Sequence, residues 1–443
     1  MLKNKVIIIG GNAAGCAAAA KAKRVNPQAE VIIFEKSNFI STGTCELPYV
    51  LSGEIKDYRS LVFFTPESFL RDKGVTVYTN TSIVKIDRRQ KNVTCCKDLV
   101  FQYDSLILAT GSTAIKLPES DSFENIYTLK NIDDIAKIYA YISSNNFHSC
   151  LVIGAGYIGL EIAGALAQRN CQVTLLEREK NLLPSSDTEF GDIVQSLCKA
   201  NNVSFYTDCE YKLIGSGNKI SAVKIGSRII NVDFVITALG FKPNTALAKE
   251  HNIEIGKSGG IKVGRKLQTS DPNIFAAGDV IEYPLQQLRK SEFIPLATLA
   301  RLSGYAAGAN AAGGNEYLSP VIKNISVKIF DKYFIQSGLT TAEVKTARIP
   351  FETVSVAMPN KVKVMPGSSI GYSKVIVEKN SHRILGAGFF GGEEVSGYGD
   401  IIALCIKKNI PLNELDEMHF NYTPPLSPFV NPLTQLSKKI KHK

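Results

Sequence analysis

Two segments of the chain share one pattern of residues, and this repeat limits the possible folds more than any other feature. In the first, KVIIIGGNAAGCAAAAKA runs from an apolar stretch through a glycine turn into an alanine-rich stretch, and AEVIIFEK follows with Glu35 near its end. In the second, SCLVIGAGYIGLEIAGALAQ is followed by CQVTLLERE, which carries Glu177. Each segment predicts a strand, a helix and a second parallel strand, so we expect an α/β chain with two Rossmann-like units.

The glycine turns predict two binding sites for dinucleotides. Glycines let the backbone approach a pyrophosphate, whose charge is met by the free N–H groups and the dipole of the following helix. An acidic residue some 20 positions later accepts hydrogen bonds from a ribose hydroxyl. The second turn has the full GxGxxG at Gly154, Gly156 and Gly159, whereas the first has Asn12 at the middle glycine's place. A tight structural turn is the alternative interpretation for each.

Three further motifs stand at the ends of predicted strands, namely LILATGS (106–112), VITALGFKPN (235–244) and NIFAAGDV (273–280). Any one of them also fits an ordinary β-turn. Asp279, directly after Gly278, would place a carboxylate at a strand end, where open α/β sheets bind ligands.

Beyond about residue 322 the pattern changes. Strand-like alternation in NISVKIF, YSKVIVEK and LGAGFFGG precedes a helical stretch near 396–408 and the proline-rich NYTPPLSPFVNPL. Since no further glycine fingerprint occurs there, we expect a separate α+β domain with packing or assembly duties.

Length and charge limit the class of protein. At 443 residues the chain exceeds one ordinary core, since domains have about 100–200 residues. Lys and Arg number 51 against 41 Asp and Glu, and the net charge of +10 favours anionic ligands such as phosphorylated cofactors. The tail LSKKIKHK is the only basic run, and we expect it to be a solvated end. No pattern predicts nucleic-acid binding.

The cysteines favour a reducing compartment. The nine cysteines have irregular spacing and form no CxxC pair, so neither a secreted disulfide framework nor a zinc site is predicted, and we expect no metal. No run of about 20 apolar residues predicts a membrane span. We therefore expect a cytoplasmic protein.

The order of these motifs resembles the flavin-dependent pyridine nucleotide-disulfide oxidoreductases over essentially the whole chain. The resemblance implies a glutathione reductase-like fold, FAD and either NADH or NADPH as cofactors, and a homodimer. It implies an FAD-binding domain in two parts (1–118 and 248–322), an NAD(P)H-binding domain (119–247) and a C-terminal α+β dimerisation domain (323–443).

The resemblance also implies the residues that hold the cofactors. For FAD they are Gly10, Gly11, Ala14, Gly15, Glu35, Lys36, Ala109, Thr110, Gly111, Gly278 and Asp279, with Leu296, Ala297 and Thr298 from a flavin-side helix. For the nicotinamide cofactor they are Gly154, Gly156, Tyr157, Ile158, Gly159, Glu161, Glu177 and Gly240. Tyr157 also fits simple helix packing. Glu177 favours NADH because a carboxylate repels a 2′-phosphate, although Arg178 would allow NADPH.

TCELPYVLSG, around Cys45, resembles the CxLPY signature of the single-cysteine branch of this family. That branch includes coenzyme A disulfide reductase, persulfide and polysulfide reductases, NADH oxidase and NADH peroxidase. The dithiol branch has a second cysteine five positions later, where this chain has Val50, and Cys16 is expected in the core. The resemblance therefore makes Cys45 a lone redox cysteine, which rests as a mixed disulfide or as a sulfenic acid.

The surroundings of Cys45 should tune its reactivity. A thiolate beside an oxidised flavin is expected to have a lowered pKa. Glu46 follows the cysteine where relatives have a small residue, and an inward-pointing carboxylate there would raise the pKa of Cys45.

Other positions separate the members of the branch. Oxygen and peroxide reducers carry a histidine where this chain has Ala13, which favours disulfide reduction. NYTPPLSP resembles a motif of coenzyme A disulfide reductases, which makes Tyr422 a catalytic proton donor across the dimer interface, with His419 as a possible helper. A tyrosine that only packs in that interface is the alternative. The second tyrosine of those relatives is absent, since Val364 and Met365 stand in its motif.

Coenzyme A carries several phosphate charges, so a site for it should be basic. Lys21 and Arg24 lie three residues apart on the first predicted helix, and Arg59 is a third candidate for substrate binding. Solvated surface positions are the alternative for all three.

These observations lead to an FAD-dependent NAD(P)H oxidoreductase that reduces a small disulfide, persulfide or polysulfide through Cys45, with coenzyme A disulfide as the leading substrate. One alternative is an NADH oxidase or NADH peroxidase that cycles a Cys45 sulfenic acid. Another is a flavoprotein redox sensor without catalytic turnover.

Overall fold

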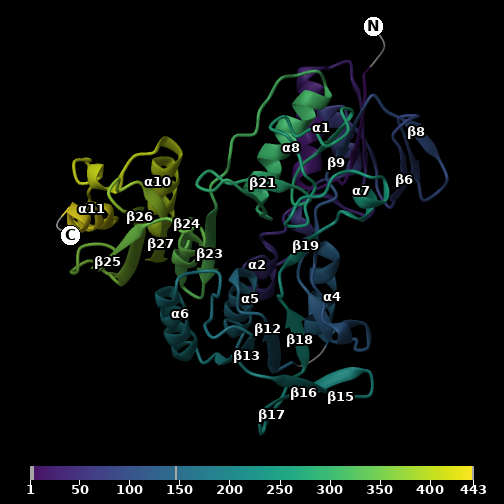
Figure 1. The fold of residues 1–443 in the computed structure, drawn as a ribbon. Helices are drawn as coiled ribbons and strands as arrows, with labels where there is room; N and C mark the ends of the chain where they lie inside the picture. Colours follow the sequence, from purple (N-terminus) through teal and green to yellow (C-terminus); the bar gives the residue numbers. More distant parts are fainter. Residues whose placement is uncertain (1–3, 145–146, 442–443) are drawn as a thin grey trace.

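The computed structural model describes residues 4–144 and 147–441. Figure 1 shows an upper part with α1 and α8 side by side, a lower part with α4, α5 and α6, and a third part that ends at the C-terminus. Each part is built around one five-stranded sheet.

The first sheet is entirely parallel, with the order β20-β9-β1-β2-β5. Its strands are β1 (Lys5–Ile9), β2 (Glu30–Phe34), β5 (Thr76–Tyr78), β9 (Ser105–Leu108) and β20 (Ile274–Ala276). Runs such as VIII and VIIF are buried, as expected for strands covered on both faces. Because β20 comes after the whole second unit in the sequence, the second unit is inserted into the first.

Two helices of the first unit pack at unusually short range. These are α1 (Ala13–Val25) and α8 (Ala297–Ala311). A Cβ at Gly304 would lie 2.2 Å from the carbonyl oxygen of Ala14, and one at Gly308 would lie 2.0 Å from that of Ala18. Glycine at both positions therefore allows the two helix backbones to touch.

The second sheet repeats the parallel design with the order β11-β18-β12-β13-β14. Its strands are β11 (Ile126–Thr128), β12 (Ser149–Ile153), β13 (Gln172–Glu177), β14 (Ser204–Thr207) and β18 (Phe234–Thr237). Its helices are α4 (Ile132–Ser144), α5 (Tyr157–Ala167) and α6 (Thr188–Ala200). Both expected βαβ units are thus confirmed.

The third sheet is antiparallel, with the order β23-β24-β27-β26-β25. The strands are β23 (Asn324–Ile329), β24 (Lys332–Gly338), β25 (Phe351–Pro359), β26 (Ile370–Glu378) and β27 (Ile384–Gly391). The helices are α9 (Thr341–Thr346), α10 (Val395–Lys408) and α11 (Pro432–Lys441), and the 3-10 turn η3 covers Leu412–Glu414. The α+β composition expected after residue 322 is confirmed.

The basic tail is not the solvated end that we expected. Residues up to Lys441 belong to α11, whose Leu433, Leu436 and Ile440 are buried against the antiparallel sheet. Lys441 pairs with Asp416 at 2.8 Å. Lysines alternate with apolar residues at helical spacing there, and the charge run concealed that amphipathic pattern.

Shorter elements complete the described chain. The small sheets are formed by β3 (Ile40–Thr42) with β4 (Val62–Phe64), β6 (Ile83–Asp87) with β7 (Asn92–Cys95) and β8 (Val100–Gln102), β10 (Ser112–Ala114) with β19 (Phe241–Pro243), β15 (Tyr211–Ser216) with β16 (Lys219–Ile225) and β17 (Arg228–Asn231), and β21 (Glu282–Pro284) with β22 (Ser291–Phe293). The remaining helices and 3-10 turns are α2 (Leu47–Ser52), α3 (Pro66–Lys73), α7 (Ala246–Glu250), η1 (Tyr58–Leu61) and η2 (Pro118–Asp121). Among the helices of residues 4–144 and 147–441, none has the length and apolar character needed to cross a bilayer.

Candidate active site

The first glycine turn joins β1 to α1 and holds Glu35 beside it. A Cβ at Gly10 would lie 2.1 Å from the carbonyl oxygen of Ala109, and one at Gly15 would lie 1.9 Å from that of Gly10. Larger residues are excluded at both positions. The Glu35 carboxylate accepts a hydrogen bond from the backbone N–H of Gly11 at 2.7 Å. The backbone of this turn can therefore approach a bound pyrophosphate closely, and the Glu35 carboxylate is fixed just after β2. Both features fit a dinucleotide.

The second turn, between β12 and α5, has the same geometry. A Cβ at Gly154 would lie 2.5 Å from the carbonyl oxygen of Ala238, and one at Gly159 would lie 1.8 Å from that of Gly154. The buried Glu177 carboxylate accepts a hydrogen bond from the backbone N–H of Ala155 at 2.7 Å. Asn12, which replaces the middle glycine in the first turn, therefore does not change the geometry that the two turns share.

The other residues predicted to hold the nicotinamide cofactor surround this second turn. A Cβ at Gly156 or at Gly240 would meet no atom within 4 Å, so open space faces both positions. The ring of Tyr157 stacks on that of Phe334 with 6.3 Å between centroids, so helix packing accounts for it in this structure. Ile158 packs at the edge of the core of this unit. A nicotinamide contact of either residue stays a prediction.

The predicted FAD residues that follow β9 and β20 lie near a lysine that the sequence did not point to. Asp279 Oδ2 accepts a hydrogen bond from Ser112 Oγ at 2.9 Å and pairs with Lys130 Nζ at 3.2 Å. Lys130 Nζ also lies 4.0 Å from the ring centroid of Phe241. Because Lys130 comes from a loop of the second unit, no local motif marked it. The predicted residues of these two loops are Ala109, Thr110, Gly111, Gly278 and Asp279.

The remaining predicted FAD residues differ in their exposure to solvent. Leu296 precedes α8, whose first residues, Ala297 and Thr298, have exposed side chains. Lys36 is exposed after β2, and Ala14 is buried in α1. The free N–H groups at the start of α8 are available to a ligand, and the contact with a flavin stays a prediction.

Cys45 lies between β3 and α2 with an exposed side chain. Desolvation by the surrounding protein raises the pKa of its thiol, the charges of Glu46, Glu161 and Asp279 raise it further, and Lys130 lowers it. The protein's own groups therefore raise the pKa of Cys45, because desolvation and three carboxylates outweigh one ammonium. The lower pKa expected beside an oxidised flavin stays a prediction. Asp279 belongs to the first unit and Glu161 to the second, so Cys45 lies where the two units meet.

Glu46 lies at the rim of this site. A Cβ at Gly43 would lie 2.7 Å from Glu46 Oε2 and 2.9 Å from Cζ of Phe63, whose side chain is 57% exposed. The carboxylate is therefore held over Gly43 beside an exposed ring, and the raising effect on the pKa of Cys45 that we predicted for it is confirmed.

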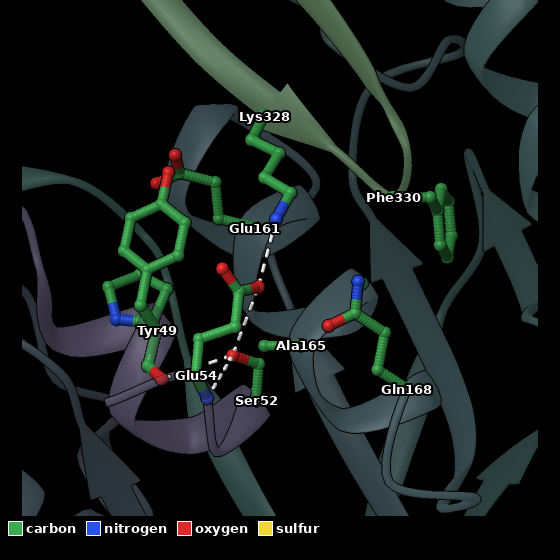
Figure 2. A pocket seen from close by; sticks show the side chains of 10 residues that line it. Tyr49, Ser52, Glu54, Glu161, Ala165, Gln168, Lys328 and Phe330 are labelled. Carbon is green, nitrogen blue, oxygen red and sulfur yellow. Dashed lines mark hydrogen bonds and ion pairs between the residues drawn. The ribbon is translucent and has the colours of Figure 1, made fainter. Parts of the chain in front are cut away.

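A small cavity separates α2 from α5 (Figure 2). Lys328 reaches it from β23, pairs with Glu54 Oε1 at 2.8 Å, and lies 5.5 Å from the ring centroid of Tyr49. Burial raises the pKa of Glu161 to about 7, although Lys328 opposes the shift, and it raises the pKa of Tyr49 to about 12. Glu161 therefore titrates near neutral pH next to the helix that follows Cys45.

No second cysteine of the described chain is paired with Cys45. Val50 is fully buried in α2, and all nine cysteines are free. Cys16 is buried in α1, its thiol donates a hydrogen bond to the carbonyl oxygen of Gly11, and burial raises its pKa to about 12. The core position expected for Cys16 is confirmed.

Two of the three predicted substrate-binding cations lie together. Lys21 and Arg24 of α1 both lie over the ring of Tyr305 in α8. Arg59 is on η1 and pairs with Asp57 at 3.6 Å, so it belongs to a different element. The substrate role of all three stays a prediction.

Tyr422 and His419 lie in an exposed segment between η3 and α11. Tyr422 is 45% exposed, and its ring contacts that of Phe429, which is 79% exposed. In Figure 1, α11 stands on the far side of the third sheet from α2. A catalytic role of Tyr422 across a dimer interface stays a prediction.

Comparison with known proteins identifies both parts of the chain. The model of the family "Pyridine nucleotide-disulphide oxidoreductase" matches residues 4–304, and the model of its dimerisation domain matches residues 327–432. An NADH oxidase from Methanocaldococcus jannaschii is 31% identical over 97% of both chains. A coenzyme A disulfide reductase from Staphylococcus epidermidis is 27% identical over 96% of this chain and 97% of its own.

A solved structure shares the whole architecture. The structure of an NAD-dependent persulfide reductase from A. fulgidus superimposes with a TM-score of 0.94 and 29% identity, over 99% of this chain and 83% of that one. The glutathione reductase-like fold expected from the sequence is therefore confirmed.

Proposed function

The chain belongs to the pyridine nucleotide-disulphide oxidoreductases, and from that premise we propose that it reduces a small disulfide, persulfide or polysulfide with NADH or NADPH through Cys45. Coenzyme A disulfide is the leading substrate. One observation supports the proposal: Cys45 is accessible, and charges from both dinucleotide-binding units act on its pKa. These charges are Asp279 of the first unit and Glu161 of the second.

The two glycine turns fit the cofactors of this reaction. The first turn, with Glu35 fixed beside it, suits FAD, and the second, with Glu177, suits the nicotinamide cofactor. FAD, when bound, supplies a route for two electrons from NAD(P)H to sulfur. We assign the first unit to residues 1–118 and 248–322, the second to 119–247 and the dimerisation domain to 323–443.

Cys45 forms and breaks the bonds to sulfur. Its thiolate attacks one sulfur of the substrate disulfide, forms a mixed disulfide and releases the other half as a thiolate, which takes up a proton. Two electrons and one proton then return the mixed disulfide to the Cys45 thiolate and free the second thiol. One protein cysteine suffices because the substrate supplies the other sulfur.

A second copy of the chain completes the site in this proposal. The exposed segment 418–431 displays Met418, Leu426 and Phe429 at 57%, 72% and 79% exposure, which a dimer would cover. The same segment would bring Tyr422 of the second copy to the released thiolate as its proton donor. The unpaired cysteines fit a reducing compartment, so a cytoplasmic location belongs to the proposal.

The mass of the intact oxidised protein under denaturing conditions tests this proposal. A gain of one coenzyme A on Cys45, removed by NADH, supports the stored mixed disulfide. The Cys45→Ser variant should keep flavin reduction by NADH and lose disulfide turnover. An unmodified Cys45 together with undiminished turnover by Cys45→Ser would end the proposal.

The similarity to an NADH oxidase supports one alternative function, the reduction of oxygen or peroxide through a Cys45 sulfenic acid. In that case Cys45 would carry only the mass of added oxygen, and oxygen consumption with NADH would exceed disulfide turnover. Ala13 weighs against this function, because it leaves no acid–base group at the position where the oxygen and peroxide reducers have histidine.

A further inference from the structure

Glu46 places a carboxylate directly beside the reactive sulfur. It follows Cys45 in the chain, and its charge raises the pKa of that thiol more than any other single charge does. The backbone carbonyl of Glu46 accepts a hydrogen bond from the N–H of Tyr49 at 3.0 Å, at the start of α2. The backbone that carries this carboxylate is therefore held by the helix.

Gly43 leaves room for the carboxylate between β3 and α2. A Cβ at Gly43 would lie 2.7 Å from Glu46 Oε2 and 2.9 Å from Cζ of Phe63, so the two side chains meet over the Gly43 backbone. That backbone is fixed, because its N–H donates a hydrogen bond to the carbonyl oxygen of Leu61 at 2.8 Å. The Phe63 side chain, on β4, is 57% exposed. A carboxylate and an apolar ring thus stand together at the rim of the Cys45 site.

The carboxylate of Glu46 has no cationic partner. Among residues 4–144 and 147–441, it forms no ion pair with any lysine, arginine or histidine, whereas two cations from neighbouring elements are paired with other carboxylates. These pairs are Arg59 with Asp57 at 3.6 Å and Lys328 with Glu54 at 2.8 Å (Figure 2).

The charges that act on Cys45 are mostly negative. Lys130 pairs with Asp279 at 3.2 Å, so these two charges largely offset each other. The charges of Glu46 and Glu161 remain. A sulfur compound with a negative charge near its reacting bond therefore meets repulsion at Cys45, whereas an uncharged or cationic compound does not.

We propose that Glu46 and Phe63 select the substrate by charge: they favour disulfides whose arms are uncharged near sulfur and disfavour anionic sulfur compounds. The inference rests on the proposed function and narrows it, because persulfides and polysulfides carry negative charge on the sulfur chain itself. The pantetheine arm of coenzyme A is uncharged near its sulfur. Its phosphates lie at the far end of that arm, beyond the range of about 8–10 Å over which exposed charges act at moderate salt.

Three disulfides with arms of similar length test the selection by charge. Cystamine carries two ammonium groups, bis(hydroxyethyl) disulfide is uncharged, and dithiodipropionate carries two carboxylates. Each reagent is mixed with the holoenzyme after its cysteines have been reduced and the reductant removed. The mass of the peptide that contains Cys45 then gives the rate of mixed-disulfide formation. The rate for Glu46→Gln is divided by the wild-type rate with the same reagent, so that the intrinsic reactivity of the reagent cancels.

The ratio of rates should depend on the charge of the reagent. Relative to the uncharged reagent, Glu46→Gln should favour the anionic one about threefold to fivefold and disfavour the cationic one by the same factor, as expected for unit charges about 4 Å apart in water. The lower pKa of Cys45 in the variant changes all three rates alike, so it does not produce this order. High salt should reduce the differences. Equal ratios for the three reagents would overturn the inference.

Two further variants complete this experiment. Glu210→Gln, the control, removes an exposed carboxylate just before β15 of the second unit and should leave the three ratios near one. Phe63→Ala should slow the reaction with pantethine about threefold, as expected when roughly 30 Å² of apolar surface is no longer covered, and should preserve the order by charge. An unchanged rate with pantethine would contradict the role of Phe63.

The measurement needs no NADH, so it separates two failures. If the three reagents follow the expected order and NADH reduces no disulfide, the proposed function fails and the selection by charge stands. If NADH reduces disulfides and the three ratios are equal, the proposed function stands and the selection by charge fails.

Discussion

Replacement of Glu161 by glutamine should make the protein more stable at alkaline pH and change little in acid. Burial raises the pKa of this carboxyl from 4.5 to about 7, so the native state keeps its proton between these values while the unfolded chain releases it. Wild-type stability therefore falls as the pH rises from about 4.5 to 7. Glutamine has the same shape and no such titration, so the variant avoids this loss.

The magnitude follows from the two pKa values. A shift of about 2.5 units at about 1.4 kcal/mol per unit costs the native state about 3.4 kcal/mol above pH 7, and about 0.8 kcal/mol of this is already present at pH 5. The variant should thus gain about 2.5 kcal/mol over the wild type between pH 5 and pH 8. In a domain of about 200 residues, the Tm of the variant minus that of the wild type should therefore rise by roughly 5–10 °C between pH 5 and pH 8.

Thermal unfolding of both holoenzymes at pH 5, 6, 7 and 8 measures this difference. Glu210→Gln, which removes a carboxylate that is exposed to solvent, is the matched control. Since ionised Glu161 also raises the pKa of Cys45, Glu161→Gln should speed alkylation of Cys45 above pH 7 and not below pH 6. A Tm difference that stays constant from pH 5 to pH 8 would refute the reasoning.

Three further changes test other parts of the structure. Glu46→Gln removes the carboxylate with the largest charge effect on the pKa of Cys45. The variant should increase the alkylation rate of Cys45 at pH 8 about threefold to fivefold, as expected when a charge interaction of about 1 kcal/mol is lost. An unchanged rate would show that the charge of Glu46 does not affect the sulfur. Gly159→Ala places a methyl group 1.8 Å from a carbonyl oxygen in the second turn, so the protein should retain FAD and lose reduction by NADH, and reduction at the wild-type rate would contradict the assignment of this turn. Lys374→Met removes the cation that pairs with the buried Asp187 at 2.8 Å, so that Asp187 keeps only its hydrogen bonds from Thr341, and should cost about 3–5 kcal/mol in thermal unfolding. Lys332→Met, at a more exposed ion pair, should cost less than about 1 kcal/mol.

The sequence by itself determined the features that depend on near neighbours. The two turns at Gly10 and Gly154 were predictable because a strand, a glycine turn and a helix are formed by consecutive residues, and the acid at the end of the next strand follows at a fixed distance. The lone Cys45 was predictable from the resemblance, because the dithiol relatives have their second cysteine five positions later, where this chain has Val50. The prediction of a solvated tail was wrong because lysines alternate there with apolar residues. These apolar residues form one face of a helix, which packs on the antiparallel sheet.

The tertiary structure alone decided how distant residues act on one another. Lys130 meets Asp279 across 149 positions of sequence, and Tyr305 lies under Lys21 and Arg24 only because Gly304 and Gly308 bring α8 against α1. The pKa values of Glu161 and Cys45 likewise depend on water removed by several elements together. Local geometry repeats wherever its residues repeat, whereas desolvation and charge depend on which elements the folded chain brings together.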